Sequence, residues 1–86
     1  MTRRLSPETL MVLEVMKEDP DRLHYGRQLR YDTGLGPGTI YPILHLLERR
    51  GWVSSTWEDI DPVRAGRPRR RLYRLTEPDV PHADLS

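Results

Sequence analysis

The sequence contains no cysteine, which excludes a disulfide framework and any metal site built on thiolates. No apolar run approaches the about 20 residues that a membrane-spanning helix needs. The N-terminal residues 1–5 are basic, but no apolar stretch follows them, so we expect no signal peptide. These absences fit a cytoplasmic protein without a membrane partner.

The sequence also has no recognisable catalytic or metal-binding constellation. His24, His45 and His82 are scattered, with no helical i, i+4 pair and no carboxylate at ligand spacing. Serine, histidine and aspartate residues occur, but their spacing does not suggest a catalytic triad, and 86 residues leave little room for an enclosed site. We therefore expect no metal, no cofactor and no enzymatic activity.

What the sequence does contain is an uneven distribution of charge. The formal net charge is only +1, yet residues 64–74 hold six arginines and no acidic residue, whereas residues 14–21 hold four acidic residues and one lysine. Such a molecule can present one strongly basic face, although an arginine run can also be a solvated loop. The length suits one small domain, which we place at residues 1–76, with residues 77–86 as a flexible tail.

Three helices are expected in the first half of the chain. Ser6 and Pro7 form a typical helix start, and residues 19–21 end that helix. Residues 23–25 indicate a short extended segment, residues 26–33 a second helix, and Gly34 its C-terminal cap. The apolar stripe of the third helix has helical spacing and consists of Ile40, Ile43, Leu44 and Leu47. The short link between the second and third helices is typical of a helix-turn-helix.

After Gly51 the pattern changes from helical to alternating. Residues 52–58 and 70–76 suit two strands, and residues 59–69 form a long loop with a basic tip between them. Trp52 and Trp57 are expected to be core or interface anchors. The predicted fold class is α+β, a winged helix-turn-helix of three helices and a two- or three-stranded hairpin, the wing.

This arrangement of helix and wing predicts how the protein would contact DNA. A helix has the diameter of the DNA major groove, and a wing lies along the neighbouring backbone. At 100° per residue, the third helix turns a polar face away from its apolar stripe. The candidate DNA-binding residues on the helix are Gly38, Thr39, Tyr41, Pro42, His45 and Arg49, and those on the wing are Arg64, Arg67, Arg69 and Arg70.

The start of the third helix leaves two alternatives open. Exposed N–H groups at Gly36 to Thr39 favour an anion, although the same residues also suit a plain turn and cap. Pro42 is costly inside a helix, by about 3 kcal/mol or more. Either the helix begins with Thr39 as its cap, or it begins at Gly36 and bends at Pro42.

Several of these segments together resemble the PadR family of winged-helix regulators. The resemblance lies in Tyr25-Gly26, in the runs 35–44 and 47–53, and in the wing run 66–76 that begins Gly-Arg-Pro. It implies a bacterial cytoplasmic repressor that binds palindromic double-stranded operator DNA as a homodimer. In some members a small-molecule effector releases the DNA.

The chain departs from this family after residue 76. Many members continue into C-terminal helices that build the dimer and the effector pocket, whereas residues 77–81 contain two prolines and predict no useful helix. A dimer through the first helix or the N-terminal residues is the alternative route. The competing hypothesis for function is a winged-helix module that binds protein and not DNA. The basic wing favours DNA over that alternative.

Overall fold

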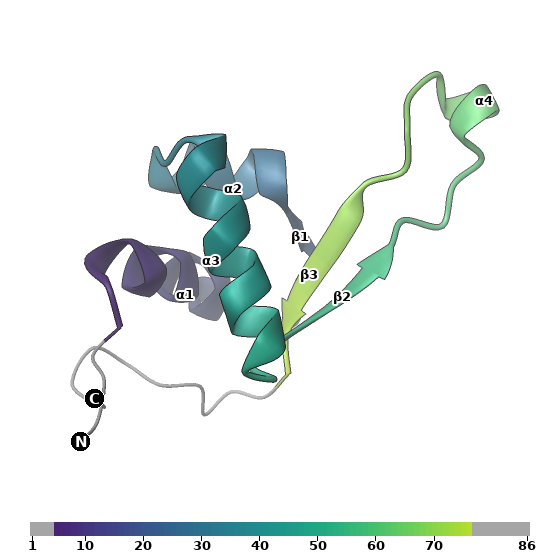
Figure 1. Cartoon of the computed structure of the whole chain (residues 1–86). Helices are drawn as coiled ribbons and strands as arrows, with labels where there is room; N and C mark the ends of the chain where they lie inside the picture. The colour runs from purple at the N-terminus through teal and green to yellow at the C-terminus, as the bar shows by residue number, and fades with distance from the viewer. Residues whose placement is uncertain (1–4, 77–86) are drawn as a thin grey trace.

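The computed structural model describes residues 5–76, which form four helices and one three-stranded antiparallel sheet (Figure 1). The helices are α1 (Pro7–Glu18), α2 (Gly26–Thr33), α3 (Pro37–Arg49) and α4 (Pro62–Ala65). The strands are β1 (His24–Tyr25), β2 (Val53–Trp57) and β3 (Arg71–Leu75). The predicted α+β winged-helix fold is confirmed. The predicted tail, residues 77–86, lies outside the described residues.

Helix α1 begins where the sequence predicts. The Ser6 hydroxyl accepts a hydrogen bond from the Thr9 backbone N–H at 3.1 Å, and Pro7 occupies the first helical position. The buried face consists of Thr9, Val12, Leu13 and Met16. Leu10 is half-buried and lies at the edge of this face.

The turn between α2 and α3 forms the expected helix-turn-helix. Helix α2 has the predicted bounds, and Gly34 caps it in the left-handed conformation with φ of 77°. Helix α3 starts with Gly36 as its N-cap and Pro42 lies inside it, so the alternative start at Thr39 is wrong. Pro42 has no N–H for the Gly38 carbonyl, and both residues are exposed, which limits the cost of that missing bond.

The core lies where α1, α2 and α3 meet the sheet. Leu13, Leu29 and Leu47 are fully buried, and Val53 and Leu75 close the core from the hairpin. The stripe predicted for the third helix is confirmed, because all four of its apolar residues belong to this cluster. Burial of this face fixes the rotation of α3, and therefore decides which side chains α3 presents outward.

Strand β3 is the middle strand of the sheet. It pairs with β2 over its whole length and also with β1, where His24 lies opposite Tyr73 and Tyr25 opposite Leu72. The predicted extended segment at residues 23–25 is therefore a strand, and it leads directly into α2. Through this pairing, strand β3 of the wing is hydrogen-bonded to β1, the strand that precedes the first helix of the helix-turn-helix.

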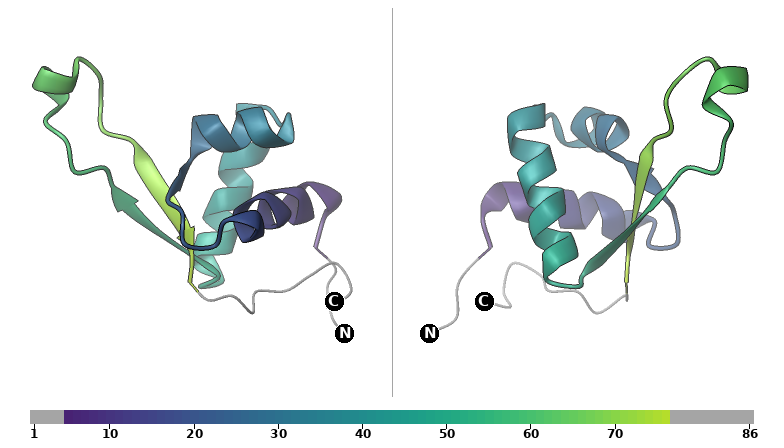
Figure 2. Two further views of the ribbon diagram at one scale, coloured as in Figure 1. Left: turned by 180° about the vertical axis from the view of Figure 1, so that it is seen from behind. Right: turned by 45° about the vertical axis from the view of Figure 1, so that its right-hand side comes forward.

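The loop between β2 and β3 projects away from the helices, with α4 at its far end (Figures 1 and 2). The sequence predicts a plain loop here, which is wrong for α4. Asp61 caps α4 by accepting from the Val63 N–H at 3.0 Å, Pro62 is its first residue, and Gly66 ends it with φ of 70°. These capping signals are strong enough to form one turn of helix within a loop.

The two tryptophans have different environments. Trp52 packs against the core, as predicted, and the Arg50 guanidinium lies 5.1 Å from its ring centroid. Trp57 does not belong to the core, because 59% of its surface is exposed at the end of β2. Trp57 lies in an open hollow that Pro62 of α4, Pro68 and Arg69 also line, so it is not a core anchor, and the alternative that it is an interface anchor stays a prediction.

Candidate nucleic-acid interface

One face of α3 carries all the side chains that the sequence assigns to DNA on this helix. All six are exposed, while the stripe on the opposite side is buried. These six residues are Gly38, Thr39, Tyr41, Pro42, His45 and Arg49. The face offers an imidazole, a guanidinium and two hydroxyls, which are donors and acceptors suited to base edges and phosphates.

Tyr41 is held against the start of α2. A β-carbon placed on Gly26 would lie only 2.5 Å from Cε1 of Tyr41 and 2.7 Å from its hydroxyl, so the ring occupies the space that a side chain at Gly26 would need. Gly26 is buried, and Tyr41 remains 45% exposed. This contact fixes the position of the phenol between α2 and α3 and leaves its outer edge open.

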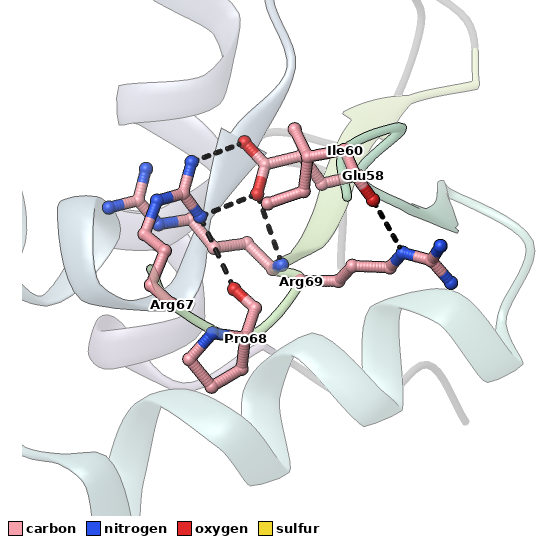
Figure 3. A network of polar contacts seen from close by, with 6 residues as sticks. Glu58, Ile60, Arg67, Pro68 and Arg69 are labelled. Carbon is pink, nitrogen blue, oxygen red and sulfur yellow. Dashed lines mark hydrogen bonds and ion pairs between the residues drawn. The ribbon is translucent and has the colours of Figure 1, made fainter. Parts of the chain in front are cut away.

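Glu58 and Arg67 join the two sides of the wing where its loop leaves β2 and β3 (Figure 3). This part, residues 58 and 67–70, is the base of the wing. The Arg67 guanidinium donates to both Glu58 carboxylate oxygens, at 2.7 and 3.0 Å, and the Arg70 backbone N–H donates to Oε1 at 3.2 Å. The Arg67 hydrogen bonds are the main cause that lowers the pKa of Glu58 from 4.5 to about 2, and the Arg70 N–H adds to the effect. The Arg67 guanidinium is therefore paired mainly with a carboxylate of the protein itself.

The other wing arginines differ in how they are held. Arg69 donates from Nε to the Ile60 carbonyl at 2.9 Å, which leaves the outer nitrogens of its exposed guanidinium directed away from that bond (Figure 3). Arg70 stacks on the Tyr25 ring at 4.3 Å. Arg71 stacks on Trp57 at 5.0 Å, with Glu48 3.9 Å away. Arg64 is exposed in the last turn of α4.

The wing and the helix-turn-helix border a common hollow of about 330 Å³. Of the candidate residues, it brings together Tyr41, Arg67, Arg69 and Arg70, and it does not include the rest of the α3 face or Arg64. Tyr41 of α3 and the base of the wing therefore open onto the same side of the molecule. Its walls are strongly basic and carry three tyrosines, namely Tyr25, Tyr41 and Tyr73.

Two exposed residues of α2 lie outside the candidate site that the sequence predicts: Arg27 was missed, and Tyr31 was left open between a core role and a contact with the DNA backbone. Arg27 lines the hollow beside the wing, and it also lines a second hollow with Tyr31 at the turn into α3. Tyr31 is 89% exposed, which excludes a core role for it. The helical period could have identified both residues, because each lies two positions from buried Leu29 and so about 200° around the helix.

Three helices around one core, a tight turn before α3 and a hairpin with a basic base define a winged helix-turn-helix domain. The chain belongs to the Transcriptional regulator PadR-like family, which its sequence matches over residues 12–78. This family is one of transcriptional regulators. Within residues 5–76, no helix has both the length and the apolar content that crossing a membrane requires.

Among solved structures, the fold is similar to that of a possible transcriptional regulator from Methanosarcina mazei Go1. The two chains are 18% identical, with a TM-score of 0.72 over 85% of this chain and 57% of that protein. The chain thus spans little more than half the length of this structural relative, and the likeness concerns the fold. No curated protein matches the sequence.

Proposed function

We propose that the protein regulates transcription by binding duplex DNA, with α3 in the major groove and the wing on the phosphate backbone. The observation that carries this proposal is the common hollow, because it places Tyr41 of α3 and the wing arginines on one side. A helix and a hairpin that face the same way match the groove and backbone of one duplex. Arg49 and His45 face outward for base edges, and Arg64 and Arg69 for phosphates.

The proposal includes a homodimer that represses by occluding a promoter. A two-fold dimer would present two recognition helices to half-sites about one helical turn apart, so its operator would be palindromic. Selection of bound duplexes from a random pool tests this point. A palindromic consensus supports the dimer, and a consensus with only one half-site contradicts it.

Salt dependence of binding tests the role of the wing. Each phosphate neutralised by an arginine contributes about −0.9 to the slope of log affinity against log salt concentration. The double variant Arg64→Ala, Arg69→Ala should therefore bind every duplex more weakly and with a flatter slope. Arg22→Ala, exposed in the loop before β1, is the matched control and should keep the slope. An equal slope in the wild type and the double variant contradicts the proposal.

A second candidate function is supported by the wing tip, where apolar surface is exposed. Val63 is 88% exposed, and Trp57, Pro62 and Pro68 line an open hollow beside it. Exposed apolar clusters mark protein contacts more often than DNA contacts. If the chain binds no duplex at low or moderate salt in a gel shift, the function is that of a protein-interaction module and not of a DNA-binding regulator.

A further inference from the structure

The hollow between the wing and the helix-turn-helix is lined by arginines that come from both parts. None of its lining residues is acidic. The arginines that line it are Arg27, Arg67, Arg69, Arg70 and Arg71. Like charges around one space repel one another, so such a wall favours an anion inside it.

Two of these arginines are already close to a carboxylate of the protein. Arg67 donates to Glu58, and the Arg71 guanidinium lies 3.9 Å from the Glu48 carboxylate. Within residues 5–76, the other guanidinium groups of the hollow take part in no ion pair. They belong to Arg27, Arg69 and Arg70. The positive charge of the hollow therefore exceeds what the protein itself neutralises.

The Arg70 guanidinium is fixed in position before any anion binds. It stacks on Tyr25, 4.3 Å from the ring centroid. Tyr25 is in turn fixed by strand pairing with Leu72 and by its N–H hydrogen bond to the Gln28 side chain at 3.3 Å. A stacked guanidinium keeps the N–H groups along its edge available for a phosphate. Because the side chain is already ordered, binding costs less conformational entropy.

Tyr41 and Arg27 bring donors to the same hollow from the two helices. A β-carbon on Gly26 would lie 2.7 Å from the Tyr41 hydroxyl, so this hydroxyl lies at the start of α2. Arg27 is the next residue of α2, and its side chain is exposed. Both residues line the hollow together with Arg70. Donors from α2, α3 and the base of the wing therefore border one space.

We propose that Arg27, Tyr41 and Arg70 form a phosphate site, which holds one phosphate of the DNA backbone against α2, α3 and the wing at once. A phosphate has several strong acceptor oxygens and matches guanidinium edges and a hydroxyl. Such a contact positions the protein on the duplex without reading a base. That DNA supplies the phosphate rests on the proposed function, whereas the affinity of the three side chains for phosphate does not.

Titration of the full chain with inorganic phosphate, followed by NMR without DNA, tests the phosphate site. The Nε–H signals of Arg27 and Arg70 and the Tyr41 ring signals should shift saturably, whereas chloride at equal ionic strength should give no saturable shift. Arg27→Gln removes a charged donor, and Tyr41→Phe removes the hydroxyl but keeps the ring against Gly26. Each should weaken phosphate binding about three- to ten-fold. Arg74→Gln, at an exposed position of β3 that does not line the hollow, is the matched control and should bind as the wild type does.

A duplex that the wild type prefers, with single uncharged methylphosphonate linkages placed in turn along each strand, tests the source of the phosphate. At one linkage in a half-site the replacement should weaken binding of the wild type about ten-fold. The same replacement should weaken Arg27→Gln about three-fold or less, because that variant has already lost part of the contact.

The absence of a saturable shift with phosphate, or equal weakening in Arg74→Gln, would overturn the phosphate site. If phosphate binds but every linkage matters as much to Arg27→Gln as to the wild type, the ligand is a free phosphate and not the DNA backbone. If phosphate binds and no duplex does, the proposed function is contradicted while the phosphate site is supported. The failures of the two proposals are thus distinguishable.

Discussion

The aromatic ring of Tyr41 occupies the space that a side chain at Gly26 would need, so the third helix contacts the start of the second helix through this ring. This contact places a phenol of the proposed recognition helix beside the arginines at the base of the wing. The position of that phenol thus depends on a hydrogen atom in place of a side chain on α2.

Gly26→Ala should move Tyr41 without unfolding the protein. The added β-carbon would lie 2.5 Å from the ring, but the clash is with the outer end of a side chain that can rotate toward solvent. We expect the free energy of unfolding to change by less than about 1 kcal/mol, since alanine is also the better helix former. Urea unfolding and the Tyr41 ring signals measure the two effects. Gly38→Ala, where the added carbon has no atom within 4 Å, is the control, and an unmoved Tyr41 in Gly26→Ala would contradict the prediction.

The base of the wing should be sensitive to acid through Glu58. Its pKa is lowered to about 2 in the folded protein from 4.5, so the folded state binds fewer protons in this interval. The contribution of Glu58 to stability is complete above pH 4.5 and is lost as the pH falls toward 2. Its carboxyl carbon should titrate in NMR with a midpoint of about 2. In Arg67→Ala the midpoint should rise toward 4.5, and a low midpoint in that variant would exclude Arg67 as the cause.

His24 should make the whole fold less stable in mild acid. Its pKa is lowered by burial, and a lowered pKa means that stability is complete above the unfolded value of 6.5 and declines as the pH falls below it. Urea unfolding at pH 7.5 and pH 5.5 should show a lower free energy of unfolding at pH 5.5. His45→Gln, at an exposed position, should keep this loss. A His24→Gln variant that folds and shows the same pH dependence would assign the effect to another group.

Replacing outward side chains of α3 should change sequence preference and not only affinity. Arg49→Ala should cost about 1–3 kcal/mol with the preferred duplex and relax selection at one base pair, if Arg49 reads a base. His45→Ala should act in the same way at another position. Selection from a random pool with each variant measures the change. A uniform loss over all sequences would instead assign that side chain to the phosphate backbone.

Much of the fold follows from local signals, but some of it depends on distant contacts. The bounds of α2 and the apolar stripe of α3 follow from helical spacing and from Gly34, all within a few residues. The pairing of Tyr25 with Leu72 joins segments 47 positions apart, and no local pattern encodes it. The turn α4 could have been found, because Asp61 and Pro62 form a regular helix start. It was missed because a strand-to-strand connection rich in proline and glycine suggests a loop.

The candidate site likewise combines features that local sequence signals predict with features that depend on distant contacts. Helical periodicity identifies the exposed face of α3, since burial of Ile40 and Leu44 fixes it. The wing arginines are visible in the sequence as a charged run, but their roles are not. Arg67 is bound to Glu58, nine positions earlier, and this pairing appears only when the hairpin closes. Arg27 lies outside the arginine run of the wing, and its place beside that run appears only when the chain folds.

The central place of β3 has a mechanical consequence. Because this strand is hydrogen-bonded on one edge to β2 and on the other to β1, the projecting arm and the first turn of α2 share one rigid backbone support. We therefore expect a displacement of the hairpin to be transmitted through Leu72 and Tyr73 to β1 and the start of α2.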